Sequence, residues 1–305
     1  MQANDGCLVG RLRDPTLDAA LLSAAYKGNL DELSHMLQAG ADPDTRGASG
    51  VTPLIACAYR SNLTRDTGGH MRCAHALLKA GAKVDVTCDL GYTALFYAAR
   101  ISRSDMCAML IKNGADIRHR NPHGASILHL AARDTSKDVY AQLIAWGADV
   151  NAVANAETAS GESVICSVCR IGDLPKARLL IEAGAHLDAP LPGAKSALAL
   201  AIRSGDPDLL RLILDQKPDL ESADRSGYTP LMHAAEMGYE HVAMLLESGA
   251  SPHGPSGEMA AVIAGNRRFA SAVNAIRIAR AQDSAQDSFQ EPATEDLGLV
   301  MRSNP

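Results

Sequence analysis

A phrase of residues recurs along this chain at a fixed interval, and the recurrence limits the folds open to it. Residues 93–116 read TALFYAARISRSDMCAMLIKNGAD, and residues 126–149, 33 positions later, read SILHLAARDTSKDVYAQLIAWGAD. The letters change, but the small, apolar and glycine positions coincide. Such a period is typical of repeat proteins, in which one unit cannot bury its apolar face alone and neighbouring units stack into a continuous core. The period therefore predicts a solenoid.

Seven positions mark the register of the repeat, each near the end of a phrase. They are Gly40, Gly81, Gly114, Gly147, Gly184, Lys217 and Gly249. The steps between them are 41, 33, 33, 37, 33 and 32 residues, so a period of 33 is interrupted by two insertions and one deletion. A degenerate copy begins at Ala19 and another spans residues 259–280. We expect about six full repeats between two degenerate caps.

Each phrase predicts two short helices and an extended connection. Thr or Ser at the head of the phrase can cap the first helix, and Pro53 or Pro230 at its first position loses no needed donor. The small pair that ends this helix, such as Ala98-Ala99, lets a second helix approach closely. The second helix stops at glycine, which takes the left-handed conformation at low cost. Turn residues follow, so the unit is helix, turn, helix and extended finger.

This unit resembles the ankyrin repeat over about residues 18–280. The best-preserved copy keeps Gly227, Thr229, Pro230, Leu231, Ala234 and Ala235. Two departures stand out: only one repeat has the motif histidine, His129, and Lys217-Pro218 replaces Gly-Ala. We therefore expect a distorted finger at residues 217–222. The resemblance implies an all-α repeat solenoid with β-hairpin-like fingers, and a concave groove of finger tips and first helices that binds other proteins.

The two ends of the chain depart from the repeat. We expect an N-terminal segment at residues 1–16, the repeat array at 17–280 and a disordered acidic tail at 281–305. The tail holds five acidic residues against Arg302 and accounts for most of the net charge of −6. Its few apolar residues bury too little surface to offset the entropy of ordering.

Composition indicates a globular protein in a reducing compartment. Hydrophobic residues make up 47% of the chain and charged residues 21%. No apolar run reaches the roughly 18 residues of a membrane span, and the N-terminus lacks a signal-peptide core. Seven cysteines show no disulfide framework, so we expect a cytoplasmic location. Arginine outnumbers lysine 21 to 8, which favours a GC-rich bacterial genome, and delivery into a host cell stays open.

Function should depend on positions that the repeat leaves free. One slot follows the second small residue of each first helix and holds Tyr26, Tyr59, Arg100, Arg133, Arg170, Arg203 and Glu236. Stacking should align the four arginines in a ladder with rungs about 10 Å apart, suited to carboxylates and phosphates. A structural interpretation stays open beside it. A cation in the last turn of a helix favours the helix dipole and the free carbonyls.

A second free slot precedes each phrase head and includes Tyr92 and Tyr228. These tyrosines fit either a binding hot spot or a half-buried spacer between fingers. Two insertions, residues 60–72 and 152–162, fit either recognition loops or neutral surface changes. The predicted partner-binding residues are Arg100, Arg133, Arg170, Arg203, Tyr92, Tyr228, Tyr59, Glu236, Arg65 and His70.

The enzyme-like signals fit the repeat better than they fit chemistry. Cys166-x-x-Cys169 looks like half of a zinc site, but both cysteines fall on first-helix positions that need small buried residues. We expect buried thiols. The ten histidines form no zinc-protease motif, and no glycine-rich phosphate loop is present. The sequence predicts no enzyme, no cofactor and no metal.

Three function classes remain open. The leading one is a non-catalytic adaptor, inhibitor or effector that binds a protein partner, acidic if the ladder is used, while acting as a monomer. The second is a binder of a small polyanion or nucleic acid, which the slightly negative body disfavours. The third is an accessory subunit of an enzyme complex. No membrane association is expected.

Overall fold

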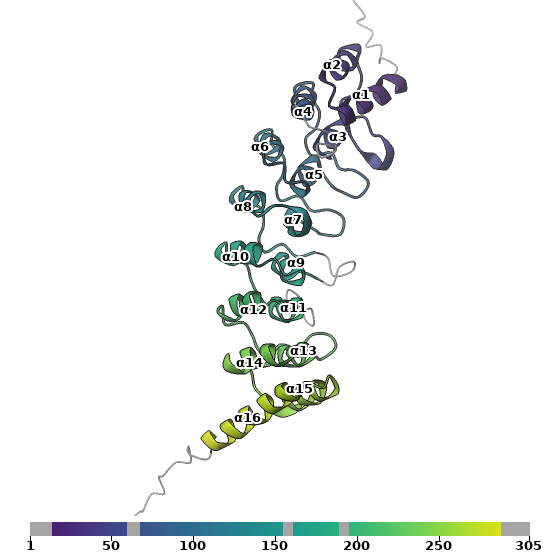
Figure 1. Ribbon diagram of the computed structural model, residues 1–305. Helices are drawn as coiled ribbons and strands as arrows, with labels where there is room; N and C mark the ends of the chain where they lie inside the picture. The colour runs from purple at the N-terminus through teal and green to yellow at the C-terminus, as the bar shows by residue number, and fades with distance from the viewer. Residues whose placement is uncertain (1–13, 60–67, 155–160, 189–194, 288–305) are drawn as a thin grey trace, which may run out of the picture. The chain divides into compact units, whose positions relative to one another are not determined.

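The computed structural model describes residues 14–59, 68–154, 161–188 and 195–287 (Figure 1). These ranges contain sixteen α-helices, one 3-10 helix at Ala48–Gly50, and two isolated β-bridges in place of any sheet. The predicted all-α repeat fold is confirmed. The described residues fall into two compact units, with the division between residues 197 and 198.

The first unit consists of helix pairs. They are α1 (Pro15–Lys27) and α2 (Leu30–Ala39), α3 (Pro53–Tyr59) and α4 (Gly69–Lys79), α5 (Ala94–Arg100) and α6 (Ser104–Lys112), α7 (Ile127–Asp134) and α8 (Lys137–Ala145), and α9 (Val164–Ile171) and α10 (Leu174–Glu182). The odd-numbered helices contact one another in sequence from α1 to α9 and form one row, with the even-numbered helices in a second row (Figure 1). Each pair is therefore one repeat.

The second unit follows the same plan. It contains α11 (Ala197–Ser204), which begins one residue earlier, α12 (Pro207–Leu214), α13 (Pro230–Met237), α14 (Tyr239–Glu247), α15 (Gly254–Asn266) and α16 (Ala270–Asp287). Helix α13 packs on α15, and α14 packs on α12 and α16. Helix α16 runs past residue 280, where we placed the end of the repeat array, and the acidic residues from 288 onward lie outside the described ranges.

The core confirms the register derived from the phrase heads. The leucines at the third position of the phrase are at most 2% exposed, namely Leu54, Leu95, Leu128, Leu198 and Leu231. Cys166 and Cys169 have no exposed surface, which confirms that they are buried thiols. Burial raises the pKa of the Cys166 thiol to about 11, so it is protonated at neutral pH. Both cysteines serve as small core residues.

The helix ends also follow the predicted chemistry. Thr52 and Ser163 accept a backbone N–H three residues on, at 3.3 and 3.4 Å, and so cap α3 and α9. Thr93 departs from this prediction, because its side chain makes no capping hydrogen bond at the start of α5. All seven register positions have positive φ, from 53° at Lys217 to 99° at Gly40. Six of them are followed by an alanine whose N–H donates to the carbonyl five residues earlier, as Ala115 does to Leu110 at 3.0 Å. This is the Schellman arrangement that closes a helix.

Lys217 adopts the same left-handed conformation as the register glycines, and its finger keeps its turn. The N–H of Glu221 still donates to Asp219, and that of Asp224 to Tyr228. The expected distortion of residues 217–222 is therefore limited to Lys217 and Pro218. The departure is confined to the helix end, because Pro218 has no N–H to donate and Lys217 carries a Cβ in a conformation that disfavours it.

Replacing Lys217 by glycine should stabilise the protein. The left-handed conformation costs an L-residue about 1–2 kcal/mol, and glycine avoids that cost. We expect Lys217→Gly to raise the midpoint of urea unfolding. Asp215→Gly is the matched control, because Asp215 has a right-handed φ of −59° and glycine there should lower the midpoint. Equal effects of the two changes would contradict this account.

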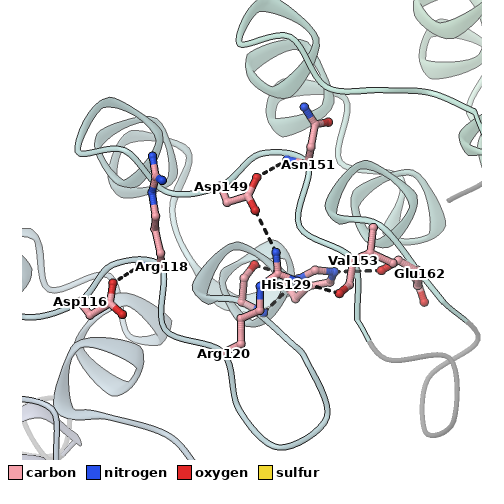
Figure 2. A network of polar contacts seen from close by, with 9 residues as sticks. Asp116, Arg118, Arg120, His129, Asp149, Asn151, Val153 and Glu162 are labelled. Carbon is pink, nitrogen blue, oxygen red and sulfur yellow. Dashed lines mark hydrogen bonds and ion pairs between the residues drawn. The ribbon is translucent and has the colours of Figure 1, made fainter.

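A ladder of side chains joins neighbouring fingers. At four of the six steps between register positions, the side chain of the residue four positions after one register position accepts the backbone N–H of the residue two positions after the next register position. Its rungs are Asp44 to Lys83 at 2.9 Å, Asp85 to Asp116 at 3.1 Å, Asn151 to His186 at 2.8 Å and Glu221 to Ser251 at 2.8 Å. Arg118 occupies this place after Gly114 and has no acceptor atom (Figure 2). The N–H of Asp149 consequently has no acceptor among the described residues.

An acceptor side chain at position 118 should stabilise this part of the first unit by bonding the N–H of Asp149. We expect Arg118→Asn to raise the free energy of unfolding by about 0.5–1 kcal/mol, the net value of one hydrogen bond. Asparagine already makes the next rung at Asn151 without adding charge beside Asp149. Arg118→Ala removes the guanidinium without supplying an acceptor for the N–H of Asp149. An equal increase in the free energy of unfolding for Arg118→Ala would disprove the explanation by this hydrogen bond.

Candidate functional site

An open groove of about 650 Å³ crosses the first helices of three successive repeats. We call it the arginine groove. Its lining residues are Tyr92, Arg100, His129, Leu130, Arg133, Asp134, Ser167, Arg170 and Ile171. The structure thus brings together three of the four predicted ladder arginines and one predicted tyrosine. The fourth arginine, Arg203, belongs to the second unit.

Helix geometry explains why the arginines share one surface. Arg100, Arg133 and Arg170 each lie in the last turn of their helix, on α5, α7 and α9. These helices pack side by side, α5 on α7 and α7 on α9, so equivalent positions point to the same face. All three residues are exposed. The same position also puts a cation near the free carbonyls of each helix end, so the capping interpretation applies to the same geometry.

The three arginines differ in their partners. Arg100 pairs with Asp134 (Nε to Oδ2, 3.3 Å), and Arg170 pairs with Glu162 (Nε to Oε1, 3.0 Å). Arg133, between them, makes no ion pair or hydrogen bond through its side chain with any residue in the described ranges. Exposed ion pairs contribute only about 0–1 kcal/mol, so a ligand can displace or share them. Of the three groove arginines, Arg133 is therefore the most available to a ligand.

The charge of the groove is opposite to that of the chain. Three arginines and one aspartate line it, and Glu162 lies beside it, whereas the whole chain has a net charge of −6. A positive concave surface on a negative protein attracts anionic groups selectively and accelerates their association.

His129 fixes the finger next to the groove (Figure 2). Its Nδ1 accepts the backbone N–H of Ser126 at 3.2 Å, and its Nε2 lies 3.0 Å from the carbonyl oxygen of Glu162. These roles require the neutral ring with hydrogen on Nε2. Burial lowers the pKa of His129 below its usual value, which favours the same neutral form. The imidazole therefore holds Glu162, the partner of Arg170, in place.

Arg120 anchors the same finger from the other side. Its guanidinium pairs with Asp149 at 2.9 Å and donates to the carbonyl oxygen of Val153 at 2.9 Å (Figure 2). Inside the finger, the N–H of Ala154 donates to the carbonyl oxygen of Glu162 at 3.1 Å. Residues 155–160, the middle of the predicted insertion at 152–162, lie outside the described ranges. The two ends of the insertion are thus fixed by the preceding repeat.

Acid should destabilise the fold through His129. Folding lowers the pKa of His129, so the unfolded state binds a proton more readily than the native state does. The free energy of unfolding should therefore fall as pH drops below about 6.5, the usual histidine pKa. We expect His129→Gln to show a shallower fall between neutral and mildly acidic pH. His241, whose pKa is also lowered by burial, should retain part of the slope. The exposed His123 provides the control, and an equal reduction by His123→Gln would contradict the assignment.

The other predicted residues occupy different environments. Tyr92 is half-buried, stacks on Phe96 at 5.5 Å and still lines the groove, so both interpretations of this slot apply to it. Tyr59 is 47% exposed. In the second unit, Tyr228 packs on His233 with ring centroids 5.3 Å apart. Glu236 lies 3.8 Å from both Arg203 and Arg267, so the same slot there is compensated inside the chain.

His70, one of the predicted partner-binding residues, presents little surface to a partner. His70 is 3% exposed in the first turn of α4, and its Nε2 lies 3.2 Å from the carbonyl oxygen of Tyr26. The insertion therefore ends before this residue, and His70 joins two repeats. Arg65, the other predicted residue of the insertion, lies outside the described ranges.

Sequence reasoning missed the acidic partners of the stacked arginines. Asp134 comes directly after the ladder arginine of its own repeat and pairs with the arginine of the preceding repeat. Glu162 precedes the phrase head at Ser163, a place where the sequence indicates only an exposed slot. Comparing charges one repeat apart could have suggested the first pair. The second depends on how the finger folds back over α9.

Comparisons with known proteins agree with this architecture. A family model described as ankyrin repeats, in three copies, matches residues 64–154 and 156–254, together more than half of the chain. The matched residues include the whole arginine groove. No curated protein shows a significant match. None of the helices in the described ranges has both the length and the apolar character needed to cross a bilayer. In the same ranges, no three His, Cys, Asp or Glu side chains are grouped so as to hold a metal ion.

Proposed function

Because this chain belongs to the ankyrin repeat family, whose repeats generally mediate protein–protein interaction, we propose that it is a non-catalytic module that binds an acidic segment of a protein partner in the arginine groove. The observation that carries the proposal is the exposed Arg133, which has no partner in the described structure and lies between two arginines with weak, exposed ion pairs. A carboxylate from a partner supplies the missing charge.

The composition of the groove favours a protein segment over a nucleic acid. Leu130, Ile171 and Tyr92 supply apolar and aromatic surface among the arginines, and Ile171 is 40% exposed. Protein interfaces combine such surface with arginine at their centres. Nucleic acids require cations spaced along a phosphate backbone, whereas Asp134 and Glu162 each compensate a groove arginine.

Selection from a display library of random peptides tests the proposal even while the partner is unidentified. We expect the wild-type protein to enrich peptides rich in Asp and Glu, and Arg133→Glu to lose that enrichment. Arg178→Glu introduces the same charge change on the exposed surface of α10, away from the groove, and should select the same peptides as the wild type. Selection without acidic enrichment, or equal loss in both variants, would refute the proposal.

The stability of the same variant separates recognition from helix capping. Arg133 makes no side-chain hydrogen bond in the described structure, so Arg133→Glu should leave the melting temperature nearly unchanged. A melting temperature many degrees lower would show that the arginine acts mainly on the dipole and carbonyls at the end of α7.

A further inference from the structure

An aromatic surface adjoins the arginine groove. Tyr59 at the end of α3, Tyr97 on α5 and Tyr92 on the finger that precedes α5 form what we call the tyrosine platform. The ring of Tyr97 makes edge-to-face contacts with two neighbours, with ring centroids 5.3 Å apart for Tyr59 and 6.0 Å apart for Tyr92. Edge-to-face contacts at these distances are favourable and hold rings in fixed relative positions.

The platform is rigid at its base and accessible at its edge. The Tyr97 hydroxyl contacts Cys88 Sγ at 3.4 Å, and burial raises the pKa of Tyr97, so its ring is anchored and neutral. Tyr92 stacks on the buried Phe96. Tyr59, by contrast, is 47% exposed. An exposed tyrosine backed by immobilised rings loses little entropy on binding and offers a large amphipathic contact surface.

The platform and the groove are one continuous surface, because Tyr92 belongs to both. Along the row of first helices, aromatic rings occupy α3 and α5, and the available cation lies on α7. Neighbouring packed helices lie about 8–10 Å apart, and an extended chain advances about 3.3 Å per residue. One repeat therefore corresponds to about three residues of an extended ligand.

We propose that this surface selects its ligand by spacing: a bulky apolar or aromatic side chain rests on the tyrosine platform while a carboxylate about three to six residues away pairs with Arg133. The inference rests on the proposed function and adds the second anchor and its distance. The aromatic contact excludes water around one end of the segment, and the arginine fixes the register at the other end.

Synthetic peptides of identical composition test the spacing. Each carries one Phe and one adjacent pair of Glu, with the Phe directly beside the pair, about four residues away, or about nine residues away. We expect isothermal titration calorimetry at low salt to show the intermediate spacing binding about tenfold more tightly than either alternative. Both chain directions are included, because an extended ligand can lie either way along the row.

The second arm measures the aromatic anchor itself. Tyr59→Ala should weaken the intermediate peptide about fivefold or more and leave its Phe→Ser counterpart unaffected, since that peptide has no ring to place. Tyr239→Ala is the matched control, because Tyr239 is 54% exposed but lies on α14 of the second unit. Melting curves confirm that each variant is folded.

The outcomes distinguish the inference from the function on which it rests. If all spacings bind equally and Tyr59→Ala has no effect while Arg133→Glu abolishes binding, the proposed function stands and the spacing inference is overturned. If binding survives Arg133→Glu, or if no peptide binds, both are overturned. Spacing preference together with selective loss in Tyr59→Ala supports both.

Discussion

Packing between successive first helices is the interaction on which everything else in this structure depends. These helices are short, seven residues in α3 and α5, and isolated helices of that length are unstable in water. Ala98, Ala99, Ala131 and Ala132 lie on two of these helices and are at most 1% exposed, and such small buried residues let neighbouring helices approach closely. Stability is therefore a property of neighbouring repeats rather than of any single one.

Close approach also lets each repeat satisfy polar groups of the one before it. Thr135 donates to the carbonyl oxygen of Ala99, and Lys176 donates to that of Ala132, both at 2.8 Å. Lys176 is 3% exposed, and its buried charge is compensated by Asp173 at 2.9 Å. Removing Asp173 would leave an uncompensated buried charge on Lys176. The bonds to Ala99 and Ala132 cross between repeats, so they restrict the relative positions of adjacent repeats. The packed row of first helices holds the groove residues in register.

The functional surface is made of the same positions that end the helices. The structure compensates Arg100 and Arg170 within the chain and leaves Arg133 without a partner in the described ranges, so equivalent residues in successive repeats differ in availability. The tyrosines differ in the same way: Tyr97 and Tyr92 are anchored by packing, whereas Tyr59 is exposed. Specificity in a repeat protein comes from such differences at equivalent positions, because the repeated positions themselves are committed to packing.

The sequence by itself determined the period, the buried leucines, the capped helix starts and the left-handed helix ends, because each depends on residue type and spacing within one unit or its neighbour. It could not show that His70 is buried, that Lys217 keeps its turn, or that Asp134 and Glu162 compensate two of the ladder arginines. The burial of His70 and the two ion pairs depend on contacts between residues 8 to 44 positions apart in the folded chain, whereas the turn after Lys217 depends on the local bond from Glu221 to Asp219. Tertiary structure alone decided which arginine is left available, because ion pairing is set by distance between folded repeats and not by position in the phrase.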